Sequence, residues 1–239
     1  MILYENSILN FKKAMEQKKL LKYMAEEFES KYSRKVSRNY NLQWKYTLET
    51  IRDIVLKAEI SDECGIRIDY VMLSTHNRFD ILFAGETNGK ARVKIIELLP
   101  WEEVYPTKQE DIVEYMEDGE LRESLHPVLQ ATSYARYLAK DAGHIIELSK
   151  KIDFQTCVFL FDCYQEDKTP CISDLDVGVP IFYANSKELI EDYLLEAAFF
   201  ENGVTVLERL HQRDQLCSAG ITAYLSDLFL PKANYNFDF

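Results

Sequence analysis

The sequence predicts an α/β protein in which a mixed central β-sheet is flanked by helices. Three strand-like runs follow one another closely, and a segment with helical spacing comes after them. Residues 154–164 (FQTCVFLFDCY) are then almost continuously apolar, which is typical of a strand buried on both faces. A strand meander followed by a helix and one more buried strand favours a mixed sheet covered by helices.

The N-terminal part of the chain is predicted to be helical. Apolar residues recur at about 3.6-residue spacing over 5–32, and a second set forms an apolar face over about 42–58. Between them, residues 31–40 (KYSRKVSRNY) are polar and basic. We expect a loop there, and it is the one cationic run of the sequence.

Three strands are predicted next, over 66–73, 78–84 and 91–98, because these runs are rich in β-branched and aromatic residues. The turn residues of 85–89 (GETNG) indicate a hairpin between the last two. From Trp101 to Leu121 the chain is polar, and we expect irregular structure.

The C-terminal half begins with Pro127, which stands where the first turn of a helix tolerates proline, so that 128–140 are predicted to be helical. A short strand over 179–183 and helices over 186–230 follow. We therefore expect a sheet-containing domain over 1–185 with a helical N-terminal extension, and a helical region over 186–239 packed on it, as two domains or as one.

The composition excludes several classes of protein. The 239 residues carry 28 Lys and Arg against 40 Asp and Glu, a net charge of −12, which does not suit a protein that coats nucleic acid without specificity but leaves room for a local basic cleft. There is no apolar window of about 18 residues for a membrane helix, and the N-terminus is too polar for a secretory signal. Five cysteines without a C-x-x-C pair argue against a zinc ribbon or a disulfide scaffold and suit the cytoplasm.

Acidic residues interrupt the predicted strands. Asp80 lies near the start of one strand and Glu97 near the end of the next, and Asp69 lies on the strand before them. Two carboxylates on neighbouring strands provide the hard oxygen ligands that Mg²⁺ prefers. The alternative is that each acid is an ordinary surface charge at a strand end.

The helix after Pro127 carries Gln130 and Tyr134 on one face, because they are four residues apart, and His126 precedes it. This set could grip a phosphate or a nucleotide. It is equally compatible with a capped helix whose tyrosine packs on the sheet.

Five segments of the sequence form a linked set: 44–45 (WK), 64–70 (CGIRIDY), 78–80 (RFD), 96–101 (IELLPW) and 126–134 (HPVLQATSY). Together they resemble the PD-(D/E)XK nuclease superfamily in its RecB-like branch, and more specifically the N-terminal nuclease-like region of bacterial Schlafen-type predicted DNA/RNA helicases. The resemblance covers about residues 1–200, and it implies a restriction-endonuclease-like core of order α-β-β-β-α-β.

The resemblance implies a Mg²⁺ or Mn²⁺ site made by the carboxylates of Asp80 and Glu97 and the carbonyl of Leu98. Asp69 or Glu49 would be an accessory acid, and Gln130 and Tyr134 would orient the substrate or the attacking water. DNA or RNA would be the partner, and the residues expected to contact it are Arg34, Lys35, Arg38 and His126.

One departure from the family concerns Leu99, which stands where active members have a lysine. Lys94 cannot replace that lysine, because three residues along a strand lead to the opposite face. The candidates for a relocated positive charge are Arg67, Arg78, Lys108 and Arg122.

Two functions stay open. The first is a nuclease-fold protein whose metal-dependent phosphodiester hydrolysis is weak or lost. The second is a catalytically inactive module that binds nucleic acid or protein in a helicase-linked DNA-processing or phage-defence complex. Members of that family continue into a P-loop motor domain, whereas this sequence has no G-x-x-x-x-G-K-[ST] motif. We therefore expect a stand-alone relative, an excised domain, or a subunit that works with a helicase or ATPase in another chain.

Overall fold

The computed structural model describes residues 2–71, 78–139, 152–164, 172, 178–212 and 214–215. Within these ranges the side chains of 39–40, 43, 70–71, 78–79 and 134–139 are outside the description.

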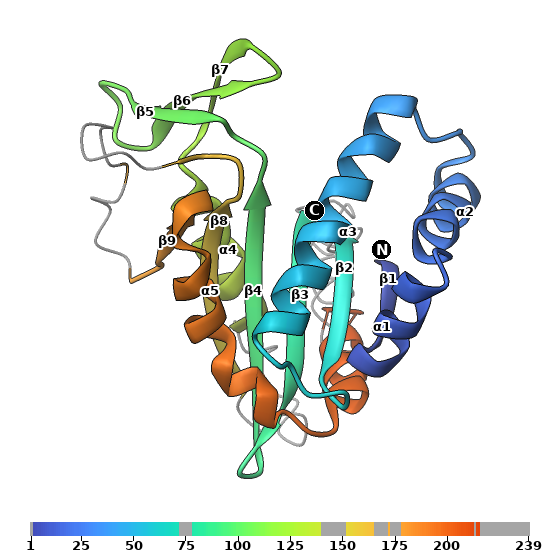
Figure 1. The fold of residues 1–239 in the computed structure, drawn as a ribbon. Helices are drawn as coiled ribbons and strands as arrows, with labels where there is room; N and C mark the ends of the chain where they lie inside the picture. Colours follow the sequence, from blue (N-terminus) through green and yellow to red (C-terminus); the bar gives the residue numbers. More distant parts are fainter. Residues whose placement is uncertain are drawn as a thin grey trace, which may run out of the picture.

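A six-stranded mixed sheet forms the centre of the molecule, with the strand order β1-β2-β3-β4-β8-β9 (Figure 1). The pairs β1–β2, β2–β3 and β3–β4 are antiparallel, whereas β8 runs parallel to β4 and β9 runs parallel to β8. The strands are β1 (Ile2–Ser7), β2 (Gly65–Val71), β3 (Arg78–Thr87), β4 (Lys90–Leu99), β8 (Asp153–Leu160) and β9 (Ile181–Tyr183). The predicted α/β class with a mixed sheet is confirmed.

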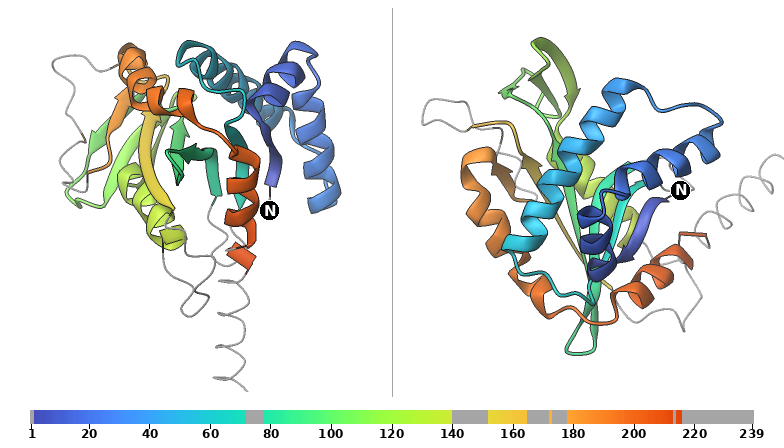
Figure 2. Two further views of the ribbon diagram at one scale, coloured as in Figure 1. Left: turned by 90° about the horizontal axis from the view of Figure 1, so that it is seen from below. Right: turned by 45° about the vertical axis from the view of Figure 1, so that its right-hand side comes forward.

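Helices cover both faces of this sheet, as the view along it shows (Figure 2). One face packs against α1 (Ile8–Glu16), α2 (Leu20–Tyr32), α3 (Arg38–Lys57) and α5 (Lys187–Leu194). The other face packs against α4 (Pro127–Ala139) and the helix over 203–212. Helix α4 lies in the connection between β4 and β8, which need such a crossover because they are parallel.

Strand β4 shows how the two cores divide. Ile96 and Leu98 belong to the core under α1–α3, whereas Val93 and Ile95 belong to the core under the 203–212 helix. Successive side chains of a strand point to opposite faces, so the even-numbered positions of β4 face α1–α3 and α5, and the odd-numbered positions face α4.

The predicted helix over 5–32 is wrong in its extent. Residues 2–7 form β1, which pairs with β2, and two helices follow it. Ser7 caps α1 by accepting a hydrogen bond from the Asn10 N–H at 3.4 Å, and Lys18, with φ of 54°, separates α1 from α2. Pairing with β2 is a tertiary interaction, and helical periodicity carries no information about it.

A second, three-stranded sheet was missed by the sequence prediction. It comprises β5 (Glu103–Pro106), β6 (Ile112–Glu117) and β7 (Glu120–Leu125) in that order. Asp118 and Gly119 both have positive φ (54° and 73°), as the type I′ turn of a tight hairpin requires. The indole of Trp101 stacks on Tyr115 with the ring centroids 4.3 Å apart. The strands are polar because most of their side chains are exposed or only partly buried.

The described part of the C-terminal region packs directly on the main sheet. It contains the short 3₁₀ helices Ala184–Ser186 and Leu195–Phe199 besides α5 and the 203–212 helix. Glu201 forms a backbone bridge to Glu86 at the end of β3. Among the described helices, none is both long and apolar enough to cross a lipid bilayer.

Candidate functional site

Three carboxylates occupy adjacent strands, and we call them the acid row: Asp69 on β2, Asp80 on β3 and Glu97 on β4. The β2–β3 register pairs the residues on both sides of Asp69 with those on both sides of Asp80. The β3–β4 register, continued by one residue beyond its last pair, sets Asp80 opposite Glu97. The strand order therefore sets the three acids at neighbouring positions of the sheet.

A backbone hydrogen bond fixes the carboxylate of Asp80. The regular β3–β4 pairing ends at Ile81 and Ile96. Beyond this pair, the N–H of Leu98 donates to Oδ2 of Asp80 at 3.0 Å. The side chain of Asp80 therefore occupies the end of the ladder, where a backbone carbonyl would otherwise accept.

Asp69 has an unusual backbone for a residue inside a strand. Its φ is 53°, in the left-handed region that residues with a side chain seldom adopt and that Asp tolerates better than most. Asp69 is also buried, and the regular pairing skips it on both sides. Left-handed residues other than glycine cluster at functional sites because the surrounding structure must maintain them.

A small cavity of about 40 Å³ lies between two members of the acid row, Asp69 and Asp80, and the helices α2 and α3, and Glu97 is not among its lining residues. We call it the acid pocket, and it has space for an ion or a water molecule. Its walls come from β2, β3, the end of β4, α2 and α3, through Met24, Trp44, Thr47, Leu48, Ile68, Asp69, Asp80, Leu98 and Pro100. Of the two accessory acids that the resemblance implies, Asp69 lines this pocket, whereas Glu49 lines a neighbouring groove.

At the end of β4, successive side chains point to opposite faces of the sheet, as expected for a strand. Glu97 is buried on the α4 side of the sheet, and Leu98 belongs to the opposite core. Leu99 is half-buried and packs with the α4 core, in register with Leu160 of β8. The side chain of Leu99 therefore points to the same face as that of Glu97.

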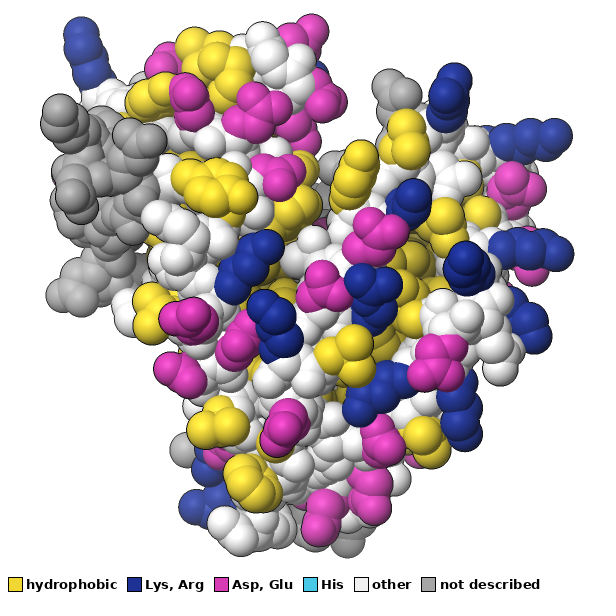
Figure 3. Space-filling model, in the orientation of Figure 1, with side chains coloured by type: hydrophobic (Ala, Val, Ile, Leu, Met, Phe, Trp, Pro, Cys, Tyr) yellow, Lys and Arg dark blue, Asp and Glu magenta, His cyan; other side chains and the backbone are white. Residues whose placement is uncertain are grey.

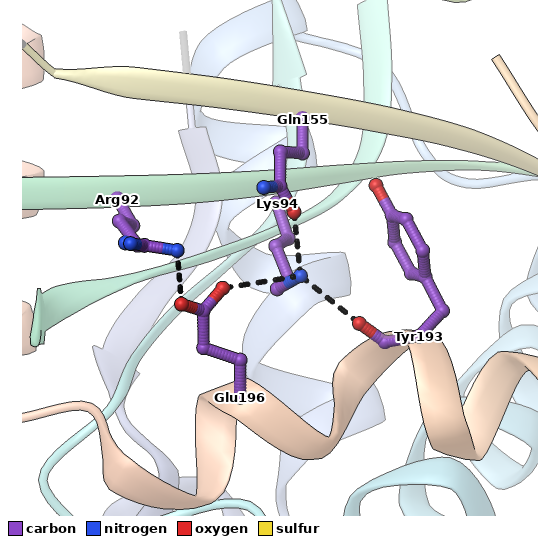
Figure 4. Close-up of polar contacts among 5 residues, drawn as sticks. All are labelled: Arg92, Lys94, Gln155, Tyr193 and Glu196. Carbon is purple, nitrogen blue, oxygen red and sulfur yellow. Dashed lines mark hydrogen bonds and ion pairs between the residues drawn. The ribbon is translucent and has the colours of Figure 1, made fainter. Parts of the chain in front are cut away.

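Lys94 lies on the face of the sheet opposite to that of Glu97 and Leu99, as predicted, and it interacts with Gln155, Tyr193 and Glu196 (Figure 4). Its ammonium group donates to Oε1 of Gln155 at 2.6 Å and to the carbonyl of Tyr193 at 2.9 Å. It also lies 3.6 Å from a carboxylate oxygen of Glu196 and 4.5 Å from the ring centroid of Tyr193. Lys94 thus joins β4 to α5 and the turn after it.

Burial lowers the pKa of Lys94, and the nearby carboxylate of Glu196 opposes this shift. Between the lowered pKa and the ordinary lysine value of about 10.4, the unfolded chain binds more protons than the folded protein. Stability therefore rises with pH in that window. We expect urea denaturation to show this rise in the wild type relative to Lys94→Met, in which the titrating group is absent. A difference between the two proteins that stays flat or falls with pH would contradict this account.

The polar residues around α4 have mainly structural contacts. Gln130 donates through its amide to Oγ of Ser124 at 3.2 Å and to the carbonyl of Leu125 at 3.1 Å, so it fastens α4 to the end of β7. Tyr134 belongs to α4, but its side chain is outside the described part of the structure.

His126 is buried at the start of α4 and caps the helix. Its Nδ1 accepts the N–H of Val128 at 3.2 Å, and its Nε2 lies 2.7 Å from the carbonyl of Ile172. Burial lowers the pKa of His126, which favours the neutral ring that these two contacts require. In the structure His126 is therefore a buried cap of α4.

The candidates for a relocated positive charge have other partners or are not described. Arg67 is buried, pairs with Glu5 and donates to the carbonyl of Leu207 at 2.9 Å. Arg122 pairs with Glu117 and Glu120 at 2.9 and 2.7 Å on the small sheet. Lys108 is exposed between β5 and β6, and the side chain of Arg78 is outside the described residues.

The predicted basic contact surface is exposed, as nucleic-acid binding requires. Arg34, Lys35 and Arg38 lie in the connection from α2 to α3 and at the first residue of α3. The guanidinium of Arg34 lies 5.4 Å from the ring centroid of Phe28 and 5.6 Å from that of Tyr32. In the described part of the chain, none of the three forms an ion pair.

Within the described residues, no group of three or more His, Cys, Asp and Glu side chains is arranged to hold a metal ion. Comparison with protein-family models, with curated proteins and with solved structures finds no match for this chain.

Proposed function

We propose that this protein has a PD-(D/E)XK nuclease fold and acts on DNA or RNA, with metal-dependent phosphodiester hydrolysis that is weak or lost. The observation that carries the proposal is the acid row on β2, β3 and β4. It is supported by the element order α3-β2-β3-β4-α4-β8, in which the small β5–β7 sheet is inserted between β4 and α4 and β8 is parallel to β4. This order resembles the core of that superfamily.

The donor chemistry fits a hard divalent cation. Asp80 and Glu97 offer carboxylate oxygens on neighbouring strands, next to the last regular β3–β4 pair, and the Leu98 N–H holds the Asp80 carboxylate in place. Such ligands suit Mg²⁺ or Mn²⁺. When bound, the metal would polarise a phosphate oxygen. The protein's own part is to fix these ligands at the end of the β3–β4 ladder.

The alternative function is a catalytically inactive module that binds nucleic acid or protein beside a helicase. Leu99 favours it, because its side chain brings no positive charge to the face that carries Glu97. The absence of a three-ligand metal group among the described residues also favours it.

Calorimetric titration with Mn²⁺ and Mg²⁺ separates these two functions. We expect the wild type to bind Mn²⁺ and Asp80→Asn to bind it at least about tenfold more weakly, since replacing even an outer partner of a metal ligand commonly costs 10–100-fold. Asp153→Asn is the matched control, because Asp153 is exposed at the opposite end of β8. No binding to the wild type, or equal binding to all three proteins, would support the inactive module.

A further inference from the structure

Charge is strongly segregated between the N-terminal layer and the rest of the chain. Residues 1–57, which include β1 and α1–α3, carry 12 Lys and Arg against 7 Asp and Glu, a net charge of +5. The other 182 residues carry 16 against 33, a net charge of −17. An acidic protein thus has one cationic layer, and that layer covers the face of the sheet on which the acid pocket lies.

The cationic layer contains a groove of about 400 Å³ between α1, the start of α2, and α3. Its floor is apolar, and its rim carries Lys18, Lys45 and Arg52 together with Glu49. The floor residues are Ala14, Met15, Leu20, Leu21 and Leu48. In Figure 3, apolar side chains are visible in the groove between α3 and the α1–α2 pair, and Lys and Arg side chains lie around them.

The rim cations can bind an incoming anion. Lys18, Lys45 and Arg52 are all exposed. Lys45 lies 4.0 Å from Glu49, and Arg52 lies 2.8 Å from its neighbour Asp53. Exposed ion pairs of this kind contribute little to stability, so a phosphate can replace the carboxylate at little cost.

The groove adjoins the acid pocket, because Leu48 of α3 lines both. On the other side of the molecule, residues 102–125 of the small sheet carry 2 Lys and Arg against 9 Asp and Glu, a net charge of −7. A polyanion is therefore attracted over α3 and repelled from the β5–β7 sheet.

We propose that this groove holds a single-stranded segment of nucleic acid, with a base on the apolar floor and phosphates at Lys18, Lys45 and Arg52. The identity of the ligand rests on the proposed function, whereas the location rests on the groove and its charges. Non-specific binding of single strands combines a cationic groove along the backbone with stacking of the bases on aromatic side chains, and in this groove aliphatic side chains take the place of the aromatic ones. A duplex keeps its bases stacked inside, so the apolar floor favours the single strand.

The test measures the affinity of a fluorescent single-stranded oligonucleotide by anisotropy over a range of salt concentrations. The groove variant is Lys18→Gln, Lys45→Gln and Arg52→Gln together. The control variant is Lys90→Gln, Arg122→Gln and Lys187→Gln, whose side chains are exposed outside the cationic layer. Each variant lowers the net charge from −12 to −15, so a difference between them reports location and not total charge.

We expect the groove variant to bind at least about tenfold more weakly than the wild type, with a salt slope reduced by about 2, since each phosphate contact on a single strand contributes about 0.7. The control variant should keep the wild-type slope. An oligonucleotide of the same charge with abasic sites should bind the wild type more weakly, because no base reaches the floor.

Equal weakening in both variants, or an unchanged groove variant, would overturn the proposal. It would also be overturned if the wild type bound an acidic amphipathic peptide in this groove and no oligonucleotide. Failure of the nuclease proposal would give a different result. The protein would then bind single-stranded oligonucleotides in the groove but would bind no Mn²⁺.

Discussion

Leu99→Lys is expected to raise Mg²⁺-dependent cleavage about 10²–10³-fold over a wild type with weak or undetectable activity. One well-placed electrostatic group contributes about that factor to a hydrolytic transition state. The structure places Leu99 on the same face of β4 as Glu97, half-buried at the end of the strand, so a lysine there brings a positive charge to the face that carries Glu97. The assay is degradation of plasmid, single-stranded DNA and RNA with Mg²⁺ or Mn²⁺.

Two further variants make this result specific. Asp80→Ala in the Leu99→Lys background should abolish the gain, because it removes a carboxylate of the acid row. Leu125→Lys adds the same charge at an exposed position of β7 and should have no effect. Robust cleavage by the wild type would mean that another basic residue replaces the lysine, and a silent Leu99→Lys protein would favour the inactive module.

Gly203→Ala is expected to lower the stability of the protein by at least about 3 kcal/mol, in the range of the most damaging steric substitutions. Gly203 starts the 203–212 helix, and its N–H donates to the carbonyl of Glu63 at 3.0 Å. A Cβ at this position would lie 2.6 Å from the carbonyl oxygen of Ala84 and against the backbone of Gly65. Backbone atoms cannot rotate away, so the helix would have to leave the sheet.

Thermal unfolding measures this effect, and a loss of this size lowers Tm by about 6–12 °C in a chain of this length. Gly89→Ala is the control, because Gly89 has a φ of 71° but nothing within 4 Å of its would-be Cβ. It should cost only the dihedral penalty of about 1–2 kcal/mol. If Gly203→Ala cost no more than Gly89→Ala, the close packing of the helix on β2 and β3 would be refuted.

The central part of the fold could be predicted from the sequence because its signals are local. The runs 66–73, 78–84 and 91–98 correspond to β2, β3 and β4, and the apolar segment 154–164 corresponds to β8. A strand buried on both faces must be apolar throughout, and a helix after Pro127 begins where proline is tolerated. Both signals lie within a single segment of the sequence, and they do not depend on which other strand or helix that segment packs against.

The elements that were missed depend on partners elsewhere in the chain. The sequence pattern predicts that the end of β1 belongs to a helix. In the structure this segment is a strand because it pairs with the edge of β2. The β5–β7 sheet is polar, and its strands are stabilised by pairing with one another and by the stacking of Trp101 on Tyr115. Strand propensity depends strongly on such context.

The same division applies to the candidate site. The sequence alone determined the α/β class, the presence of Asp69, Asp80 and Glu97 on successive strands, and the leucine at position 99. Only the tertiary structure decided that the strand register lines the three acids up in one row, that Asp69 adopts a left-handed backbone, and that His126 is a buried helix cap. The physical reason is that residue types and their periodicity are properties of a segment, whereas register, burial and the segregation of charge arise when segments far apart in the chain pack together.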